Sequence, residues 1–109
     1  MQLECFVDEA KKDVIIAGDF NFPEINWDLQ YSGNNSFGST AFLNTVQKLL
    51  LLQHVNFATR ARGSDTPHTL DLVITDSQSI TNIEALAPLG KSDHAVLMIV
   101  TNFLVLTLL

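Results

Sequence analysis

The sequence contains a single cysteine and few charged residues. Cys5 alone cannot form an intrachain disulfide, so we expect a reducing compartment in which this thiol fills space and is not a nucleophile. Charged residues make up 17% of the 109 residues and apolar residues 47%. This balance excludes a disordered tail, a collagen-like chain and a long charged coiled coil, and the length predicts one domain at most.

Basic residues are scarce as well, at six against twelve acidic residues, which gives a net charge of −6. Such a chain has no overall attraction for a polyanion, so binding to nucleic acid would depend on a local basic patch or on bound metal cations. The same acidity suits a metal-binding site equally well.

Long apolar runs are also missing. Residues 1–10 carry three acidic side chains where a signal peptide needs an apolar run, so no signal peptide is expected. The apolar stretch 95–109 is shorter than the roughly 20 residues of a membrane-spanning helix, and three polar residues interrupt it. We expect a buried strand with its continuation there, and no membrane partner.

The spacing of apolar residues predicts an α/β or α+β chain with a layered sheet core. Residues 1–12 have a helical 3–4 spacing and are expected to end a helix, and a second helix is expected to begin at Ser39 or Thr40. Five strands are predicted, over residues 14–17, 54–57, 69–75, 80–87 and 94–100. Residues 26–39 and 60–67 are expected to be loops.

Asp19 and Asn21 stand where the first of these strands meets a loop. In an extended backbone they would point to the same face, about 7 Å apart. A carboxylate there can act as a base or bind a metal, and an amide can donate a hydrogen bond to a phosphoryl oxygen without adding negative charge. The alternative is an ordinary turn at the end of the strand, because Gly18, Asp19 and Asn21 are all of types that favour turns.

Asp71 interrupts an otherwise apolar strand. The side chains of Leu70, Leu72 and Ile74 share one face, which places Asp71 on the other. A buried carboxylate costs several kcal/mol unless it is paired or hydrogen bonded. Asp71 is therefore expected to have a partner, and the alternative is an aspartate at an exposed edge of the strand.

Asp93 and His94 lie at the entrance to the last strand, where an aspartate beside a histidine can supply a metal ligand together with a general acid or base. His54 lies among apolar residues and is expected to be a hydrogen-bonded histidine of the core or of a sheet edge. His68 lies in a loop that contains proline and is expected to be solvated. His94 is thus the histidine that is a candidate for chemistry.

Three segments, in this order, resemble the last three motifs of the endonuclease/exonuclease/phosphatase superfamily. They are Ile16-Ala17-Gly18-Asp19-Phe20-Asn21, Thr69-Leu70-Asp71-Leu72-Val73 and Ser92-Asp93-His94. The closest likeness is to the endonuclease domain of non-LTR retrotransposons, because Phe22-Pro23 and Trp27 follow the first motif and the run 63–71 contains the second. The likeness covers about residues 13–100, and three motifs in order at these spacings make it specific.

The resemblance implies metal-dependent hydrolysis of phosphodiester bonds in DNA, with Mg²⁺ or Mn²⁺ as the cofactor. Asp19 would position or deprotonate the attacking water, and Asn21 would hold the phosphate. Asp93 would lie near the metal, and His94 would contact the scissile phosphate. Asp71 would orient and polarise His94, which agrees with the need of an imidazole for a carboxylate that fixes its tautomer. Asp19 and Asp93 are the candidate metal ligands.

Arg60 and Arg62 lie in the loop that, by the same resemblance, approaches the DNA, and two arginines there would offset the acidic charge of the chain. The alternative is that both are simply solvated. A retrotransposon product would act inside the cell, in the nucleus.

The resemblance reaches only the C-terminal half of the family's four-layered α/β sandwich. The first half of that domain carries a metal-binding glutamate, for which no matching motif is found here, so residues 1–109 are expected to form a partial domain with weak or absent metal binding. The missing half, or a reverse transcriptase region, would then be a partner, and residues 104–109 look unrelated to the family. Two alternatives remain: a non-catalytic remnant or interaction fragment, and a phosphomonoesterase of the same superfamily.

Overall fold

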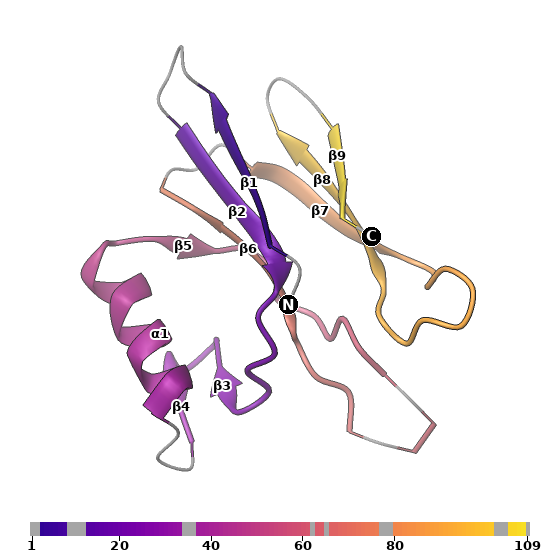
Figure 1. The fold of residues 1–109 in the computed structure, drawn as a ribbon, viewed down its shortest axis with the longest axis horizontal. Coiled ribbons are helices and arrows are strands. Elements are labelled where there is room, and N and C mark those ends of the chain that lie inside the picture. The colour runs from indigo at the N-terminus through magenta and orange to yellow at the C-terminus, as the bar shows by residue number, and fades with distance from the viewer. Residues whose placement is uncertain are drawn as a thin grey trace.

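The computed structural model describes residues 3–8, 13–33, 37–61, 63–64, 66–76, 80–101 and 105–108, with only the backbone for residues 3–8 and 13. The main sheet has four antiparallel strands in the order β1-β2-β6-β5: Leu3–Asp8 (β1), Asp13–Asp19 (β2), Asp71–Thr75 (β6) and Leu52–Gln53 (β5). A second sheet has three antiparallel strands: Ile80–Leu86 (β7), Val96–Thr101 (β8) and Val105–Leu108 (β9). The helix Phe37–Lys48 (α1) lies beside a small hairpin of Ile25–Asn26 (β3) and Tyr31–Ser32 (β4) (Figure 1).

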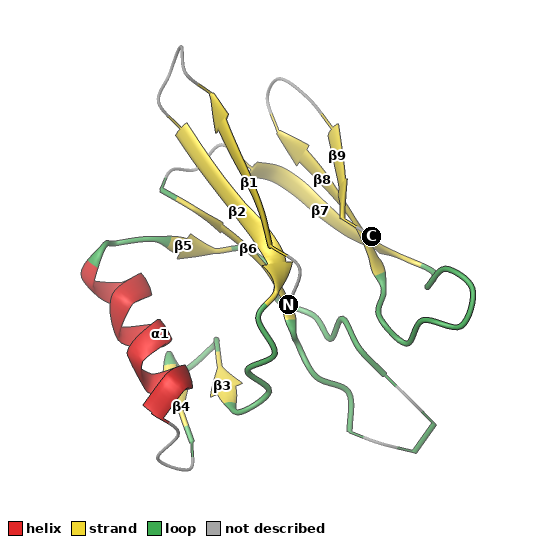
Figure 2. Ribbon diagram, viewed as in Figure 1, coloured by secondary structure: helices red, strands yellow, loops and turns green. Residues whose placement is uncertain are grey.

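These elements form three layers, namely the helix, the four-stranded sheet and the three-stranded sheet (Figure 2). Alternate residues of β6 face opposite layers: Val73 lies in the core between the two sheets, whereas Leu72 and Ile74 lie in the core beneath α1. In β2, Ile15 faces the first core and Ile16 the second. The predicted α/β sandwich is therefore confirmed, and the first predicted strand is covered on both faces.

The N-terminal segment forms a strand, so the expected helix over residues 1–12 is wrong. β1 pairs antiparallel with β2, beginning with Leu3 opposite Gly18. Leu3, Cys5 and Val7 also alternate at a spacing of two, and in so short a segment both periods fit. The edge of β2 decides between them, because pairing there satisfies the backbone groups of both strands. The expectation that the Cys5 thiol fills space concerns a side chain that is not among those described.

The strand expected at residues 54–57 is also wrong. β5 covers only Leu52–Gln53. The side chain of Gln53 then bonds back to the backbone of Val55, donating to its carbonyl oxygen at 2.9 Å and accepting from its N–H at 2.6 Å. These bonds occupy groups that a strand would pair with its neighbour, so the strand ends there.

Other boundaries differ from the predicted ones by a few residues. The expected loop 26–39 contains the hairpin β3–β4 and the first turn of α1, which begins at Phe37. β8 begins at Val96 instead of His94, because His94 pairs with the backbone of Arg60 in an isolated bridge. β9 extends the second sheet by pairing with β8, so residues 105–108 belong to the fold.

Helix α1 ends in a Schellman motif built without glycine. The N–H of Leu51 donates to the carbonyl oxygen of Val46 at 2.9 Å, and the N–H of Leu50 donates to that of Gln47 at 3.1 Å. Leu50 adopts a φ of 55°, in the left-handed region, and the residue is 82% exposed. Leu51 packs with Val46 in the core beneath α1, which is the apolar contact that usually accompanies this motif.

Replacing Leu50 by glycine is expected to stabilise the protein. The left-handed conformation costs a residue with a side chain roughly 1–2 kcal/mol, and the greater freedom of glycine in the unfolded chain offsets about half of the gain. Leu50→Gly should therefore raise the free energy of unfolding in urea by about 0.5–1 kcal/mol. Leu49→Gly is the control, because Leu49 is not among the positive-φ residues, and it should destabilise. A Leu50→Gly variant less stable than wild type would contradict the prediction.

His54 is a hydrogen-bonded, half-buried histidine, as expected. Its Nε2 lies 2.7 Å from the hydroxyl oxygen of Thr75. Burial lowers the pKa of the His54 imidazole from its ordinary value of 6.5, because desolvation disfavours the charged ring. The unfolded chain thus takes up this proton more readily than the folded chain. The stability that His54 contributes is complete above pH 6.5 and is lost as the pH falls towards the folded pKa.

The His54→Gln variant is expected to lose stability less steeply on acidification. Glutamine keeps a donor for Thr75 but takes up no proton, so the decline of the urea midpoint between about pH 7 and about pH 5 should become shallower. His68→Gln is the matched control, because it makes the same substitution at a histidine that is not bonded to Thr75. If the His54 variant follows the wild-type profile over this range, the histidine does not contribute as described.

Candidate active site

Two aspartates of the main sheet meet at one end of it. Asp19 is the last residue of β2 and Asp71 is the first of β6, and the antiparallel register places them directly opposite each other. The N–H of Phe20 donates to the carbonyl oxygen of Leu70 at 2.9 Å and continues the pairing beyond them. His94 enters from the other side, just before β8 of the second sheet. The cluster therefore lies where the ends of the two sheets meet.

The Asp71 carboxylate is held by His94. Oδ2 of Asp71 lies 2.8 Å from Nδ1 of His94, and a carboxylate can only accept, so Nδ1 carries the proton. Asp71 is 7% exposed, which rules out the alternative of an aspartate at an exposed edge. The prediction that this buried carboxylate has a partner is confirmed. Its partner is the predicted one, and the bond fixes both the tautomer and the orientation of the ring.

The second nitrogen of His94 lies between two further carboxylates. Nε2 is 3.8 Å from Oδ2 of Asp19 and 3.9 Å from Oδ1 of Asp93. Both distances are too long for a direct hydrogen bond, and these contacts are ion pairs only when the ring is protonated. The side chains of His94, Asp19 and Asp93 are each between a quarter and about a third exposed, so a small ligand or a water molecule can reach this space.

Asp19 and Asn21 form a turn, which is one of the two alternatives that the sequence left open. Oδ1 of Asp19 accepts the backbone N–H of Asn21 at 2.9 Å, and Asn21 has a φ of 53°. Asparagine tolerates this left-handed conformation better than most residues, and the aspartate closes the turn. The turn fixes one carboxylate oxygen of Asp19 and leaves the other towards His94. The side chain of Asn21 is exposed, and its predicted role stays a prediction.

Arg60 pairs with Asp93 and not only with solvent. Its Nε donates to Oδ2 of Asp93 at 3.0 Å, which holds that carboxylate beside His94. The backbone of Arg60 also bridges both His68 and His94. His68 is half-buried in this arrangement and therefore less solvated than expected. Arg62, the other arginine expected to approach DNA, lies outside the described residues.

A buried threonine near the cluster was not singled out from the sequence. Thr59 is 1% exposed, and its hydroxyl oxygen accepts the backbone N–H groups of Leu70 and Asp71, both at 3.0 Å. In the sequence, a threonine that precedes an arginine in a loop does not indicate that its hydroxyl binds the backbone of a distant strand. Only the folded chain shows that Thr59 contacts the start of β6.

The donor atoms of the cluster suit a divalent cation. Ligand atoms of Asp19, Asp71 and His94 all lie within 4.8 Å of one another. Mg²⁺ is usually held by one or two carboxylates together with water and substrate phosphate. Asp71 is already bonded to His94, which leaves Asp19 and Asp93, the residues predicted as metal ligands, as the carboxylates on either side of the ring nitrogen.

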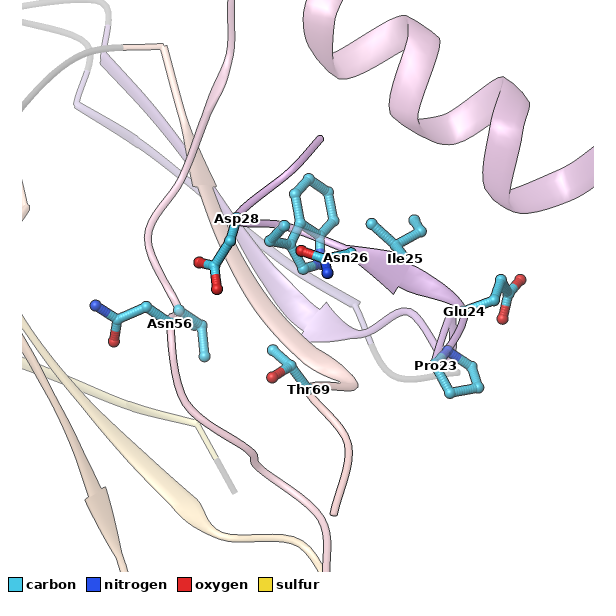
Figure 3. A pocket seen from close by; sticks show the side chains of 9 residues that line it. Pro23, Glu24, Ile25, Asn26, Asp28, Asn56 and Thr69 are labelled. Carbon is cyan, nitrogen blue, oxygen red and sulfur yellow. The ribbon is translucent and has the colours of Figure 1, made fainter. Parts of the chain in front are cut away.

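A separate cavity of about 330 Å³ opens beside β3 (Figure 3). Its lining comes from the segment after the first motif and from the residues before and after the central loop: Pro23, Glu24, Ile25, Asn26, Trp27, Asp28, Val55, Asn56 and Thr69. None of the cluster residues lines it. The cluster at the end of the sheets and this cavity are therefore separate features of the molecule.

Comparison with protein families gives a match over most of the chain. A family model described as endonuclease-reverse transcriptase matches residues 1–98. No curated protein and no solved structure was found to match the chain. Within the described residues, no helix is both long and apolar enough to cross a membrane.

Proposed function

The chain belongs to the endonuclease-reverse transcriptase family, and we propose that its cluster of Asp19, Asp71, Asp93 and His94 serves the divalent-metal-dependent hydrolysis of phosphodiester bonds in DNA. The observation that carries the proposal is the 2.8 Å bond between Asp71 and His94, which leaves Nε2 of the ring facing two carboxylates. An oriented imidazole beside carboxylates has what phosphoryl chemistry requires: a donor for the phosphate and a base for water.

His94 is the group that binds the phosphate. The buried carboxylate of Asp71 stabilises the protonated ring, as the aspartate does in a Ser-His-Asp triad. Protonated Nε2 then donates a charge-assisted hydrogen bond to a phosphoryl oxygen, and this bond strengthens as negative charge builds up in the transition state. Asp71 does not touch the substrate in this scheme. It is a positioning residue that acts through His94.

Asp19 is the group that takes the proton of the attacking water. Its Oδ1 is fixed by the N–H of Asn21, so the carboxylate has a set orientation, and its side chain is 34% exposed, so water reaches it. A base must lie within hydrogen-bond reach of the proton that it removes, and a fixed, hydrated carboxylate meets this condition. The Asn21 amide would add a neutral donor to the phosphate.

Asp19 and Asp93 would hold the divalent cation. When bound, such an ion supplies positive charge that offsets the charge of the phosphate and favours the attack of water. The pairing of Arg60 with Asp93 keeps that carboxylate in place. A bound cation would also reduce the electrostatic repulsion between DNA and a chain with a net charge of −6.

Binding to the chain itself tests the proposal. In NMR spectra, millimolar Mn²⁺ should broaden the signals next to Asp19 and Asp93 first, and a short DNA duplex should shift the ring signals of His94. The double variant Asp19→Asn with Asp93→Asn should abolish the selective broadening, and Asp28→Asn is the exposed control. Unchanged signals in all cases would favour a non-catalytic remnant. A shift of His94 with phosphomonoesters but not with DNA would favour the phosphomonoesterase alternative.

Residues 1–109 by themselves are expected to show no measurable Mg²⁺-dependent nicking of plasmid DNA. Each carboxylate already accepts a hydrogen bond: Asp19 from Asn21, Asp71 from His94 and Asp93 from Arg60. Mg²⁺ gives up its water reluctantly, so these partly engaged groups should hold it weakly. The assay compares the purified chain with its Asp19→Ala variant. Nicking by the first and not by the second would show that the chain is an enzyme on its own.

A further inference from the structure

We propose that Thr59 is a positioning residue, which holds Asp71 and His94 in the geometry that the hydrolysis requires. This inference rests on the function proposed above. Asp71 is the first residue of β6 and His94 lies two residues before β8, and the bond between their side chains is 2.8 Å long. Thr59 contacts both segments, through its side chain on one side and through its backbone on the other.

The side chain of Thr59 holds the start of β6. Its hydroxyl oxygen accepts the N–H groups of Leu70 and Asp71, each at 3.0 Å, and so uses both of its lone pairs. β5 pairs with β6 only at Ile74 and Thr75, far from Asp71. The hydroxyl therefore provides, at the start of β6, an acceptor that this neighbouring strand does not provide. The side chain is buried, and water cannot replace it without entering the core.

The backbone of Thr59 holds the segment of His94. Its carbonyl oxygen accepts the N–H of Ala95 at 2.7 Å, and the N–H of Ala61 donates to the carbonyl oxygen of Asp93 at 3.2 Å. These two bonds lie on either side of His94 along the chain. The segment from Thr59 to Ala61 thus fixes the backbone of His94 while the Thr59 hydroxyl fixes the backbone of Asp71.

Thr59 and its neighbours thus connect the backbone at Asp71 to the backbone at His94 through a few hydrogen bonds. Any shift of Asp71 relative to Thr59 changes its distance from His94, because His94 is tied to the same three residues. A displacement of a reactive group by about 1 Å lowers the reaction rate strongly. A link that fixes Asp71 relative to His94 would therefore increase turnover. Without the hydroxyl, Asp71 could keep its strand pairing with β2 and Leu70 its bond from the N–H of Phe20, but the N–H groups of Leu70 and Asp71 would lose a buried acceptor.

The test compares Thr59→Val, which keeps the shape and removes the hydroxyl, with Thr59→Ser, which keeps the hydroxyl. The readout is the Nδ1–H proton of His94 in NMR spectra of the full chain, and it needs neither metal nor activity. In wild type and Thr59→Ser this proton should give a downfield signal that exchanges slowly with water. In Thr59→Val its exchange should be about tenfold faster or the signal should be lost, with the amide signals of β8 retained.

The inference is overturned if Thr59→Val keeps the wild-type signal, or if Thr59→Ser folds and loses it. Should the valine variant not fold, Thr59→Ala replaces it, because the serine and alanine variants differ only by the hydroxyl. The outcome is independent of the proposed function. If Mn²⁺ and DNA leave the cluster unaffected while Thr59→Val loses the His94 signal, the function is wrong and the positioning by Thr59 stands.

Discussion

The Asp71→Asn variant is expected to lose about 10⁴ in turnover with its fold intact, the size of the loss when the aspartate of a Ser-His-Asp triad becomes an amide. The asparagine oxygen can still accept from Nδ1 of His94, so the ring keeps its place. The neutral amide cannot stabilise the protonated imidazole, which the scheme requires for binding the phosphate. The loss should therefore appear in kcat and leave the thermal midpoint close to that of wild type.

The measurement needs an active protein, which we define as residues 1–109 joined to the first half of an active family endonuclease. Plasmid nicking in Mg²⁺ gives the rate. Asp76→Asn is the matched control, because Asp76 is an exposed aspartate that accepts the N–H of Val14 at 3.2 Å at the far end of β6. Nicking by the Asp71 variant at a rate near wild type would exclude the positioning role of Asp71.

The second large effect is expected in the core between the sheets. Leu97 of β8 is 0% exposed there, and Leu97→Ala should lower the free energy of unfolding by about 2–5 kcal/mol. A domain of this kind has only about 5–15 kcal/mol in total, so the variant should be close to unfolding at 37 °C. The reason is the lost transfer energy of the side chain together with the cavity that it leaves behind.

Urea denaturation measures this loss, and Leu86→Ala is the control. Leu86 belongs to the same sheet but is 44% exposed, so its removal should cost well under half as much. Equal losses in the two variants would mean that Leu97 is not packed between the sheets as the structure shows.

The predicted site depended on residues that are unusual for their local surroundings. Asp71 stood out because a carboxylate in an apolar strand needs a partner, and His94 was the predicted one. The family match confirms the relationship that three short motifs indicated. Such residues can be recognised from the sequence alone, because burial of a charge has a large free-energy cost wherever it occurs.

Features set by distant contacts could not be predicted in the same way. The segment 1–12 fits two periods, and only the edge of β2 selects the strand. Asp93 is oriented by Arg60, which lies 33 residues earlier. Thr59 is an ordinary loop threonine until β6 is placed beside it. At Asn21 the sequence left two alternatives open, an extended strand and a turn. The hydrogen bond from the N–H of Asn21 to Asp19 selects the turn.

The placement of the cluster across two sheets has a consequence for regulation. Asp71 begins β6 of the four-stranded sheet, and His94 lies two residues before β8 of the three-stranded sheet, so the Asp71–His94 bond joins the first sheet to the segment that enters the second. A shift of the segment before β8 relative to the start of β6 would lengthen this bond, while the strands of each sheet could keep their own hydrogen bonds. In the proposed mechanism, a partner that moves the segment before β8 relative to β6 would therefore change the activity without altering the secondary structure.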